Sequence, residues 1–504
     1  MLKPLATLAL LVALVSTTAC APDDVAPPEP ETIDVDAPEI VIPRHLDEDG
    51  QPQLEDHAVR FRDVHLRMHA IGIGGSIHRS SQMGHASYNA ELAGDPMRDR
   101  GRTWVDQVQF VEASFNHDGA LAPRLVLEPE SGDWTRPDTV HLSDYSLAAL
   151  AYHPHHRGDR FEDHGLYESM TYMPATYMTR PGVHLLSHYY SGGQFFPSRT
   201  HEGTSLHSMS HGTAGIHGLI YAYVRWHKPG GADDMGQLSE EQLRAWLQHT
   251  PDDLVQIARE IATAFDDAWD DEVNFYRFAE EPEDVNLETV GALLRGHKGL
   301  YEMLYVFGDD NDKRLAEDLF ERSTVILEQV VDLAQPWGLP ASVRFTDEGI
   351  TAASDVVDSE SLWLFVSDFT SGFSYARERE GTSRFLERTS PELMEAIGSF
   401  LDDMLQGALS HQFNEDGYLV SQVSLEDGAV VDDRRSTAAI GAFVTAAADA
   451  YGAGPAFASA GDWEEADEET VERSRALYDT ILHHLEALDE LFVADVAVAE
   501  AHTE

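Results

Sequence analysis

The sequence feature that most constrains the fold is an internal repeat of apolar helices introduced by small residues. The segment HGTAGIHGLIYAYV, which starts at His211, aligns with RGHKGLYEMLYVFG, which starts at Arg295. Weaker copies surround Gly372 and Ala439. Successive copies lie roughly 70 to 85 residues apart, which leaves room for two helices and their loops in each unit. The repeat therefore predicts a chain built from several similar helix pairs.

The segments between these copies predict helices of a second kind, with a single apolar face. In one of them Thr250 can cap the helix, Pro251 takes the first helical position, and apolar residues recur at helical spacing. The same pattern follows Ser390. One-sided helices suit an outer ring, and apolar helices suit an inner ring, where glycine at the start of each lets backbones converge. The predicted fold class is mainly α, an α/α toroid with a loop-rich N-terminal region.

The inner segments, above all SHGTAGIHGLIYA, resemble those of the lanthionine synthetase C-like toroids, and more loosely the α/α barrels of glycan-processing enzymes. The resemblance implies a toroid over roughly residues 205 to 490. Members of the synthetase family hold a zinc ion with two cysteines and a histidine. This chain has one cysteine, Cys20, so the resemblance does not extend to that zinc site or its chemistry.

The N-terminal segment MLKPLATLALLVALVSTTAC predicts an export signal, because Lys3 precedes an apolar stretch too short to span a bilayer. Cys20 ends this segment after three small residues, and the segment resembles a bacterial lipoprotein signal, in which that cysteine is acylated. An ordinary secretory signal with an incidental cysteine is the alternative. The lipoprotein interpretation predicts an exported protein of the cell envelope, held to a membrane through an N-terminal lipid.

Composition divides the chain into four regions. Residues 1–20 are the expected signal peptide, and residues 21–50, rich in proline and acid, are expected to form a disordered tether. Residues 51–200 form a histidine-rich region that either caps or completes the toroid. Residues 201–495 are the expected toroid domain.

The charge of the chain excludes one class of partner. The formal net charge is -55, from 89 acidic and 34 basic residues. Such a surface repels nucleic acid and anionic lipid head groups. An acid excess of this size is typical of proteins solvated in concentrated salt, where self-repulsion is screened, and it favours a halophilic source.

Histidines are concentrated in one part of the sequence. Eighteen of the 25 lie between His57 and His227. Two pairs, His184 with His188 and His207 with His211, have the spacing of four that places both rings on one helix face, where they could bind zinc or another transition metal. The alternative is that these rings pack beside tyrosines or line a polar pocket without a metal.

The helix repeat suggests where a catalytic site would form. If the inner helices share a direction, His211, Arg295, His297, Arg434 and Arg435 gather at one mouth of the toroid, where helix N-termini attract anionic groups. A carboxylate beside an imidazole or a tyrosine suffices for hydrolysis or elimination at a glycosidic bond.

We therefore expect Glu202 and His211 to act as general acid and base, with Tyr190 and Arg435 orienting an acidic substrate. A solvated loop charge is the alternative for Glu202. The expected function is the processing of an extracellular glycan or a similar polymer. A non-catalytic envelope lipoprotein that captures a metal or another ligand through the four paired histidines is the rival, and a structural envelope protein is a third interpretation.

Overall fold

The computed structural model describes most of the chain from residue 41 onward, within the unit of residues 33–504. The described residues are 41–43, 45–46, 52–53, 58–70, 115–117, 119–127, 134–136, 139–151, 180–226, 241, 244, 247–278, 284–373, 391–453 and 468–494. Cys20 and nearly all of the expected tether lie outside them, so the lipoprotein signal stays a prediction. In the described part of the chain, no helix combines the length and the apolar character needed to cross a membrane.

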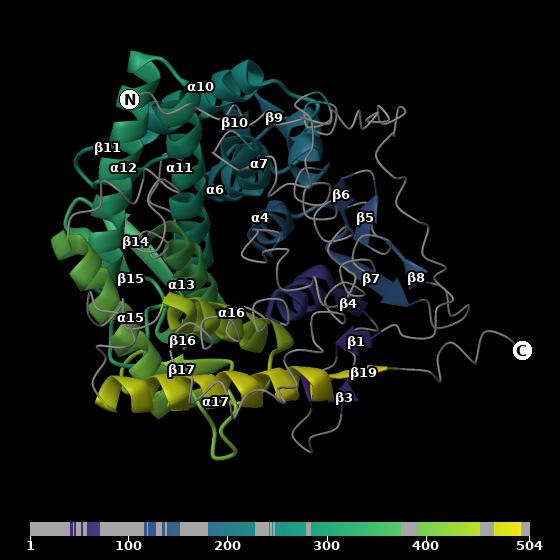
Figure 1. Ribbon diagram of the computed structural model, residues 1–504, viewed down its shortest axis with the longest axis vertical. Helices are drawn as coiled ribbons and strands as arrows, with labels where there is room; N and C mark the ends of the chain where they lie inside the picture. The colour runs from purple at the N-terminus through teal and green to yellow at the C-terminus, as the bar shows by residue number, and fades with distance from the viewer. Residues whose placement is uncertain are drawn as a thin grey trace, which may run out of the picture. The chain divides into compact units, whose positions relative to one another are not determined.

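Six helices of this unit form a closed inner ring. They are the helix of residues 61–70, α4 (Leu142–Ala151), α6 (Leu206–Gly215), α11 (Leu287–Phe307), α13 (Ser359–Phe373) and α16 (Thr437–Ala453). From α4 to α16, each packs against the next in this order, as Figure 1 shows for α6, α11, α13 and α16. Helix 61–70 closes the ring: His65 Nε2 donates to the Leu147 carbonyl of α4 at 2.9 Å, and Leu66 lies against Gly441 of α16.

Further helices pack outside this ring. They are α7 (His217–Trp226), α10 (Pro251–Ala268), α12 (Asp310–Val331), α15 (Pro391–His411) and α17 (Glu468–Leu491). Helix α7 is buried on nearly every side over residues 217–224, so it lacks the single apolar face expected of an outer helix. Helices α10 and α12 pack on α11, and α17 packs on α16. In α12 a single stripe that includes Leu319, Ile326 and Val330 is buried, whereas nearly every residue of α11 up to Leu304 is buried. The mainly helical α/α toroid predicted from the sequence is confirmed.

Glycines within the repeat and beside it bring the inner helices together. In the repeat, a Cβ added to Gly296 of α11 would lie 3.0 Å from Thr213 Cγ2 and 3.3 Å from the Ala214 nitrogen in α6. A Cβ added to Gly441 would lie 2.8 Å from the Leu66 carbonyl carbon and 2.9 Å from its oxygen. A Cβ on Gly291 would lie 3.0 Å from the Cα of Phe365 in α13. Side chains at these positions would push neighbouring backbones apart, so close approach explains the small residues.

Short strands connect the helices, and in two of the sheets one strand leads directly into an inner helix. Strand β13 runs directly into α11 in the sheet β13-β14-β15, and β16 runs directly into α13 in the sheet β16-β17-β18. All pairs are antiparallel. The strands are β1 (Val41–Pro43), β2 (His45–Leu46), β3 (Pro52–Gln53), β4 (Ala58–Arg60), β5 (Asn116–His117), β6 (Ala120–Leu121), β7 (Arg124–Leu127), β8 (Trp134–Thr135), β9 (Tyr190–Ser191), β10 (Gln194–Phe195), β11 (Trp269–Asp270), β12 (Phe275–Tyr276), β13 (Asp284–Asn286), β14 (Ser342–Thr346), β15 (Gly349–Ala352), β16 (Val356–Asp358), β17 (Gln422–Ser424), β18 (Val430–Asp432) and β19 (Phe492–Ala494).

The structure corrects where the inner helices begin. The sequence repeat placed the glycines at the helix starts, but α11 begins at Leu287, so Gly296 lies more than two turns inside it. Likewise α6 begins at Leu206, six residues before Gly212. The repeat therefore marks where helices touch one another, and the residues at their first turns are different ones.

Candidate active site

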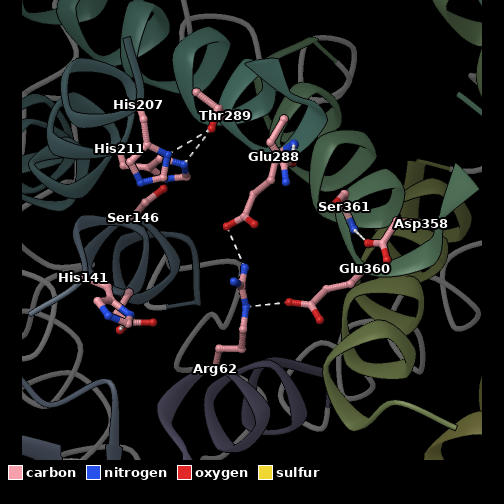
Figure 2. Close-up of polar contacts among 12 residues, drawn as sticks. Arg62, His141, Ser146, His207, His211, Glu288, Thr289, Asp358, Glu360 and Ser361 are labelled. Carbon is pink, nitrogen blue, oxygen red and sulfur yellow. Dashed lines mark hydrogen bonds and ion pairs between the residues drawn. The ribbon is translucent and has the colours of Figure 1, made fainter. Parts of the chain in front are cut away.

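The first turns of the inner helices converge on the guanidinium group of Arg62. Its Nη2 lies 2.6 Å from Glu288 Oε1, and its Nε lies 2.5 Å from Glu360 Oε1 (Figure 2). Arg62 is the second residue of helix 61–70, Glu288 the second of α11 and Glu360 the second of α13. Their side chains are 22%, 13% and 20% exposed, so all three are partly accessible to solvent.

Local capping fixes the two carboxylates. The Asn286 side chain accepts the backbone N–H of Glu288 at 2.8 Å, and the Asp358 carboxylate accepts the backbone N–H of Ser361 at 2.9 Å. Both capping residues end the strands that lead into α11 and α13. An N-cap holds the first turn in place, so the acid that follows it has a defined position.

Two further carboxylates come from the same level of the ring. Asp144, the third residue of α4, is buried, and one of its oxygens lies 3.8 Å from His141 Nδ1. Asp63 forms an ion pair with Arg60 at 2.8 Å. We use the name first-turn cluster for Arg62, Asp144, His207, Glu288, Thr289 and Glu360.

Burial sets the protonation of this cluster. It raises the pKa of Glu360 to about 7 and that of Asp144 to about 8, against the attraction of Arg62, and the charge of Glu288 adds to both rises. For Arg62 burial acts against the charged form, but Glu288 and Glu360 outweigh it and raise its pKa. At neutral pH, Asp144 is therefore mostly protonated, and Glu360 is poised to give up or take a proton.

Two imidazoles meet one hydroxyl beside these acids. Thr289 Oγ1 lies 3.2 Å from His207 Nδ1 and 3.2 Å from His211 Nε2, as Figure 2 shows. The ring centroids of the two histidines are 4.4 Å apart. Burial lowers the pKa of His207 and lowers that of His211 strongly, so both rings are neutral at neutral pH. His207 is exposed, and His211 lies one turn deeper in α6 and is buried.

A buried ion pair lies further inside the ring. Arg295 Nε is 3.0 Å from Asp368 Oδ1, and Arg295 Nη2 donates to the Ser146 hydroxyl at 2.6 Å and to its carbonyl at 2.8 Å. Both charged side chains are nearly inaccessible to solvent, and burial raises the pKa of Asp368 to about 7. This pair joins α4, α11 and α13 to one another.

The sequence-based catalytic residues are only partly brought together. His211 contacts Thr289 of the cluster, but Glu202 is exposed in the loop before α6. The Tyr190 hydroxyl donates to Glu260 of the outer helix α10 at 2.6 Å, and Arg435 lies over the ring of Tyr418 at 3.7 Å. These contacts give no support to catalytic roles for Glu202, Tyr190 and Arg435.

The expected gathering of basic residues at one mouth is also revised. Arg295 lies within the ring, while His297 bonds Ser323 of α12 at 2.9 Å and packs against Phe265, so it faces the outer helices. Arg434 is exposed and pairs with Asp432 at 2.7 Å.

The four histidines expected to bind a metal remain two separate pairs, and three of them hydrogen-bond to side-chain hydroxyl groups. His184 Nδ1 lies 2.9 Å from the Tyr145 hydroxyl, His188 is exposed, and His207 and His211 share Thr289. In the described part of the chain, no three histidine, cysteine, aspartate or glutamate side chains form a group that could hold a metal ion. A zinc or other transition-metal site at His184, His188, His207 and His211 therefore has no support in this geometry.

Sequence reasoning missed Arg62, Asp144, Glu288, Thr289 and Glu360. Each lies in the first turn of an inner helix, just after a strand or a loop. A usable signal was the polar or capping residue ahead of an apolar helix, as in DVNLETV at α11 and VVDSESLW at α13. Together these groups can hold a polar ligand, donate a proton from a carboxyl group and offer neutral imidazoles to an oxygen atom.

Comparison with known proteins shows a distant likeness at the level of structure. No protein-family model and no curated protein matches the chain. A solved sugar epimerase from a ruminal bacterium is 11% identical, with 80% of this chain and 91% of that chain covered and a TM-score of 0.42. For a D-mannose isomerase the values are 12%, 81%, 90% and 0.41. For an unsaturated glucuronyl hydrolase specific for heparin they are 10%, 81%, 89% and 0.38. The resemblance to lanthionine synthetase C-like proteins gains no support, and the toroid stands on the helix contacts described above.

Proposed function

We propose that the protein is an enzyme that processes a carbohydrate by acid and base chemistry at the first-turn cluster. The observation that carries the proposal is the bridge from Arg62 to Glu288 and Glu360, with one carboxyl group held half-protonated near neutral pH. General acid catalysis is most effective when the pKa lies near the working pH. The roles expected for Glu202 and His211 pass to Glu360 and Glu288 in this proposal.

Each group has a role that follows from its surroundings. Glu360 donates the proton to a leaving or rearranging oxygen, because burial favours its protonated form. Glu288, paired with Arg62, acts as the carboxylate partner that accepts a proton or stabilises positive charge. Arg62 holds both acids in place and offers donors to substrate oxygens.

The chemistry of the cluster favours a polyhydroxylated substrate. The first-turn cluster contains guanidinium, carboxyl, imidazole and hydroxyl groups, so a ligand bound to it must both donate and accept hydrogen bonds at several points. Sugars meet this requirement. A nucleic acid is disfavoured by the net charge of -55.

A panel of oligosaccharides and monosaccharides tests the function. Reducing-end release reports hydrolysis, ultraviolet absorbance of unsaturated products reports elimination, and proton NMR reports isomerisation. For the substrate found, Glu360→Gln and Glu288→Gln should each lower kcat by about a hundredfold or more. Glu348→Gln, an exposed glutamate in the turn between β14 and β15, is the matched control and should leave kcat unchanged. Full activity in both cluster variants contradicts the proposal.

We also propose that this enzyme is exported and held at the cell envelope by a lipid on Cys20. Support for this comes from residues 1–20 of the sequence alone, where a short apolar stretch ends in the only cysteine of the chain. In that setting the substrate is an extracellular glycan or a fragment of one, and the acid excess suits a salt-rich exterior.

A further inference from the structure

The contact of Thr289 with two histidines limits how protons can be arranged. A threonine hydroxyl has one proton and two lone pairs, so it can donate to one imidazole nitrogen and accept from the other, or accept from both. Thr289 Oγ1 lies at 3.2 Å from a nitrogen of each ring. Because both rings are neutral, each carries one N–H and one lone pair. If Thr289 accepted from both rings, its buried hydroxyl proton would have no acceptor among the described residues, so two proton arrangements remain.

In the first arrangement His207 donates from Nδ1 to Thr289, and Thr289 donates to His211 Nε2. The proton of His211 then lies on Nδ1, a buried atom without a hydrogen-bond partner among the described residues. In the second arrangement His211 donates from Nε2 to Thr289, and Thr289 donates to His207 Nδ1. His211 Nδ1 is then a bare lone pair. A buried N–H without an acceptor is rarer in folded proteins than a buried acceptor without a donor.

We propose that Thr289 is a positioning residue that fixes His207 as a hydrogen-bond donor toward the substrate. The chain of donation runs from His211 Nε2–H to Thr289 Oγ1, from its hydroxyl to His207 Nδ1, and from His207 Nε2–H to a substrate oxygen. His207 is the exposed member of the pair, and the charges of Glu288 and Arg62 both act on it. Its catalytic meaning rests on the proposed function, in which a neutral donor complements the acid Glu360. No proton is lost or gained along the chain, since each group keeps the one it carries.

Nitrogen NMR of the imidazoles tests the inference without any substrate. The full chain is labelled with ¹⁵N-histidine, and the signals of His207 and His211 are assigned by their loss in His207→Gln and His211→Gln. Both rings should carry the proton on Nε2, with His207 Nδ1 shifted as a hydrogen-bond acceptor. A proton on Nδ1 of either ring overturns the proposal.

Matched variants separate the hydroxyl from the shape of the side chain. Thr289→Val removes the hydroxyl at nearly constant volume, and His207 Nδ1 should then lose its acceptor shift and average between the two tautomers. Thr289→Ser keeps the hydroxyl and should preserve the shifts. Unchanged His207 shifts in Thr289→Val overturn the proposal, provided that the remaining histidine signals show the variant to be folded.

Kinetics supply the second measurement. On the substrate found in the panel, Thr289→Val should lower kcat by about three- to tenfold, the loss of one hydrogen bond, and Thr289→Ser should restore it. If the tautomers are as expected but no sugar is turned over, the function fails and the proton arrangement stands. If a sugar is turned over and the tautomers differ, only the role of Thr289 fails.

Discussion

Replacing Glu360 by glutamine should stabilise the folded protein at alkaline pH and leave it nearly unchanged in mild acid. Burial raises the pKa of Glu360 from its ordinary value of 4.5 to about 7. Between these values the folded chain binds a proton that the unfolded chain has released, so the free energy of unfolding falls as the pH rises. At about 1.4 kcal/mol per unit, ionising this carboxyl in the folded state costs about 3 kcal/mol above pH 7. The value of about 7 already includes the effect of Arg62, which lowers the pKa of Glu360, so the ion pair is not counted a second time.

Glutamine has the shape of the protonated acid and does not ionise, so it avoids this cost. Urea unfolding of the unchanged protein, Glu360→Gln and the control Glu348→Gln at about pH 5 and about pH 8.5 measures the effect. Glu360→Gln should gain up to about 3 kcal/mol over the unchanged protein at the higher pH only. Asp368 also has a raised pKa, but Glu360 does not contribute to it, so its effect cancels in the difference. The charge of Glu360 does raise the pKa of Asp144, so Glu360→Gln relieves that as well and the gain at the higher pH increases. The same difference at both pH values would refute the reasoning, as would a loss of stability at alkaline pH.

Three further predictions address the ring, the buried ion pair and the anchor. Gly441→Ala should destabilise the protein by about 1 to 3 kcal/mol in urea unfolding, because the new Cβ meets the Leu66 backbone, and this outweighs the gain of about 1 kcal/mol that alanine brings to a helix. A gain in stability would show that the ring does not close there. Arg295→Met should lower the free energy of unfolding by about 3 to 5 kcal/mol at about pH 8.5, because the Asp368 charge loses this partner, and the second change Asp368→Asn should restore part of that stability. Equal stability of the single and double variants would argue against the ion pair. Cys20→Ser should abolish incorporation of radiolabelled fatty acid in bacteria that express the chain, whereas labelling that persists would exclude Cys20 as the lipid site.

The sequence predicted those parts of the fold that depend on local rules. Thr250 followed by Pro251 predicted the start of α10, and the same pattern at Pro391 predicted α15. Local capping and a single apolar face do not depend on distant parts of the chain, so they can be read from a short segment. The glycine repeat predicted close helix contacts, as Gly296 shows where α11 meets α6.

The positions around the ring required tertiary information. The helix 61–70 contains His65, Arg67 and His69, which are buried, so its polar residues hide the apolar pattern of an inner helix. Its neighbour α4 is ten residues long, too short for a clear repeat. These two helices lie before residue 200, and they complete the ring that α6, α11, α13 and α16 form in part.

The candidate site depends on the direction of the inner helices. Asp144, Glu288 and Glu360 stand two or three residues into α4, α11 and α13, and a carboxylate at such a position is stabilised by the helix dipole. The outer helices begin in the same way, for example with Asp252 in α10, so an acid in a first turn does not by itself indicate a site.

Only when several such helices point the same way around a ring do their acids crowd together. Crowding and burial then raise the pKa of Glu360 and Asp144, in opposition to the dipole, and Arg62 becomes necessary to hold the acids at one point. The reactivity we assign to Glu360 is therefore a property of the closed ring. Gly441→Ala, which disrupts the contact of α16 with Leu66 of helix 61–70, should therefore lower the pKa of Glu360 toward its ordinary value, and urea unfolding should then lose less stability between mild acid and alkaline pH.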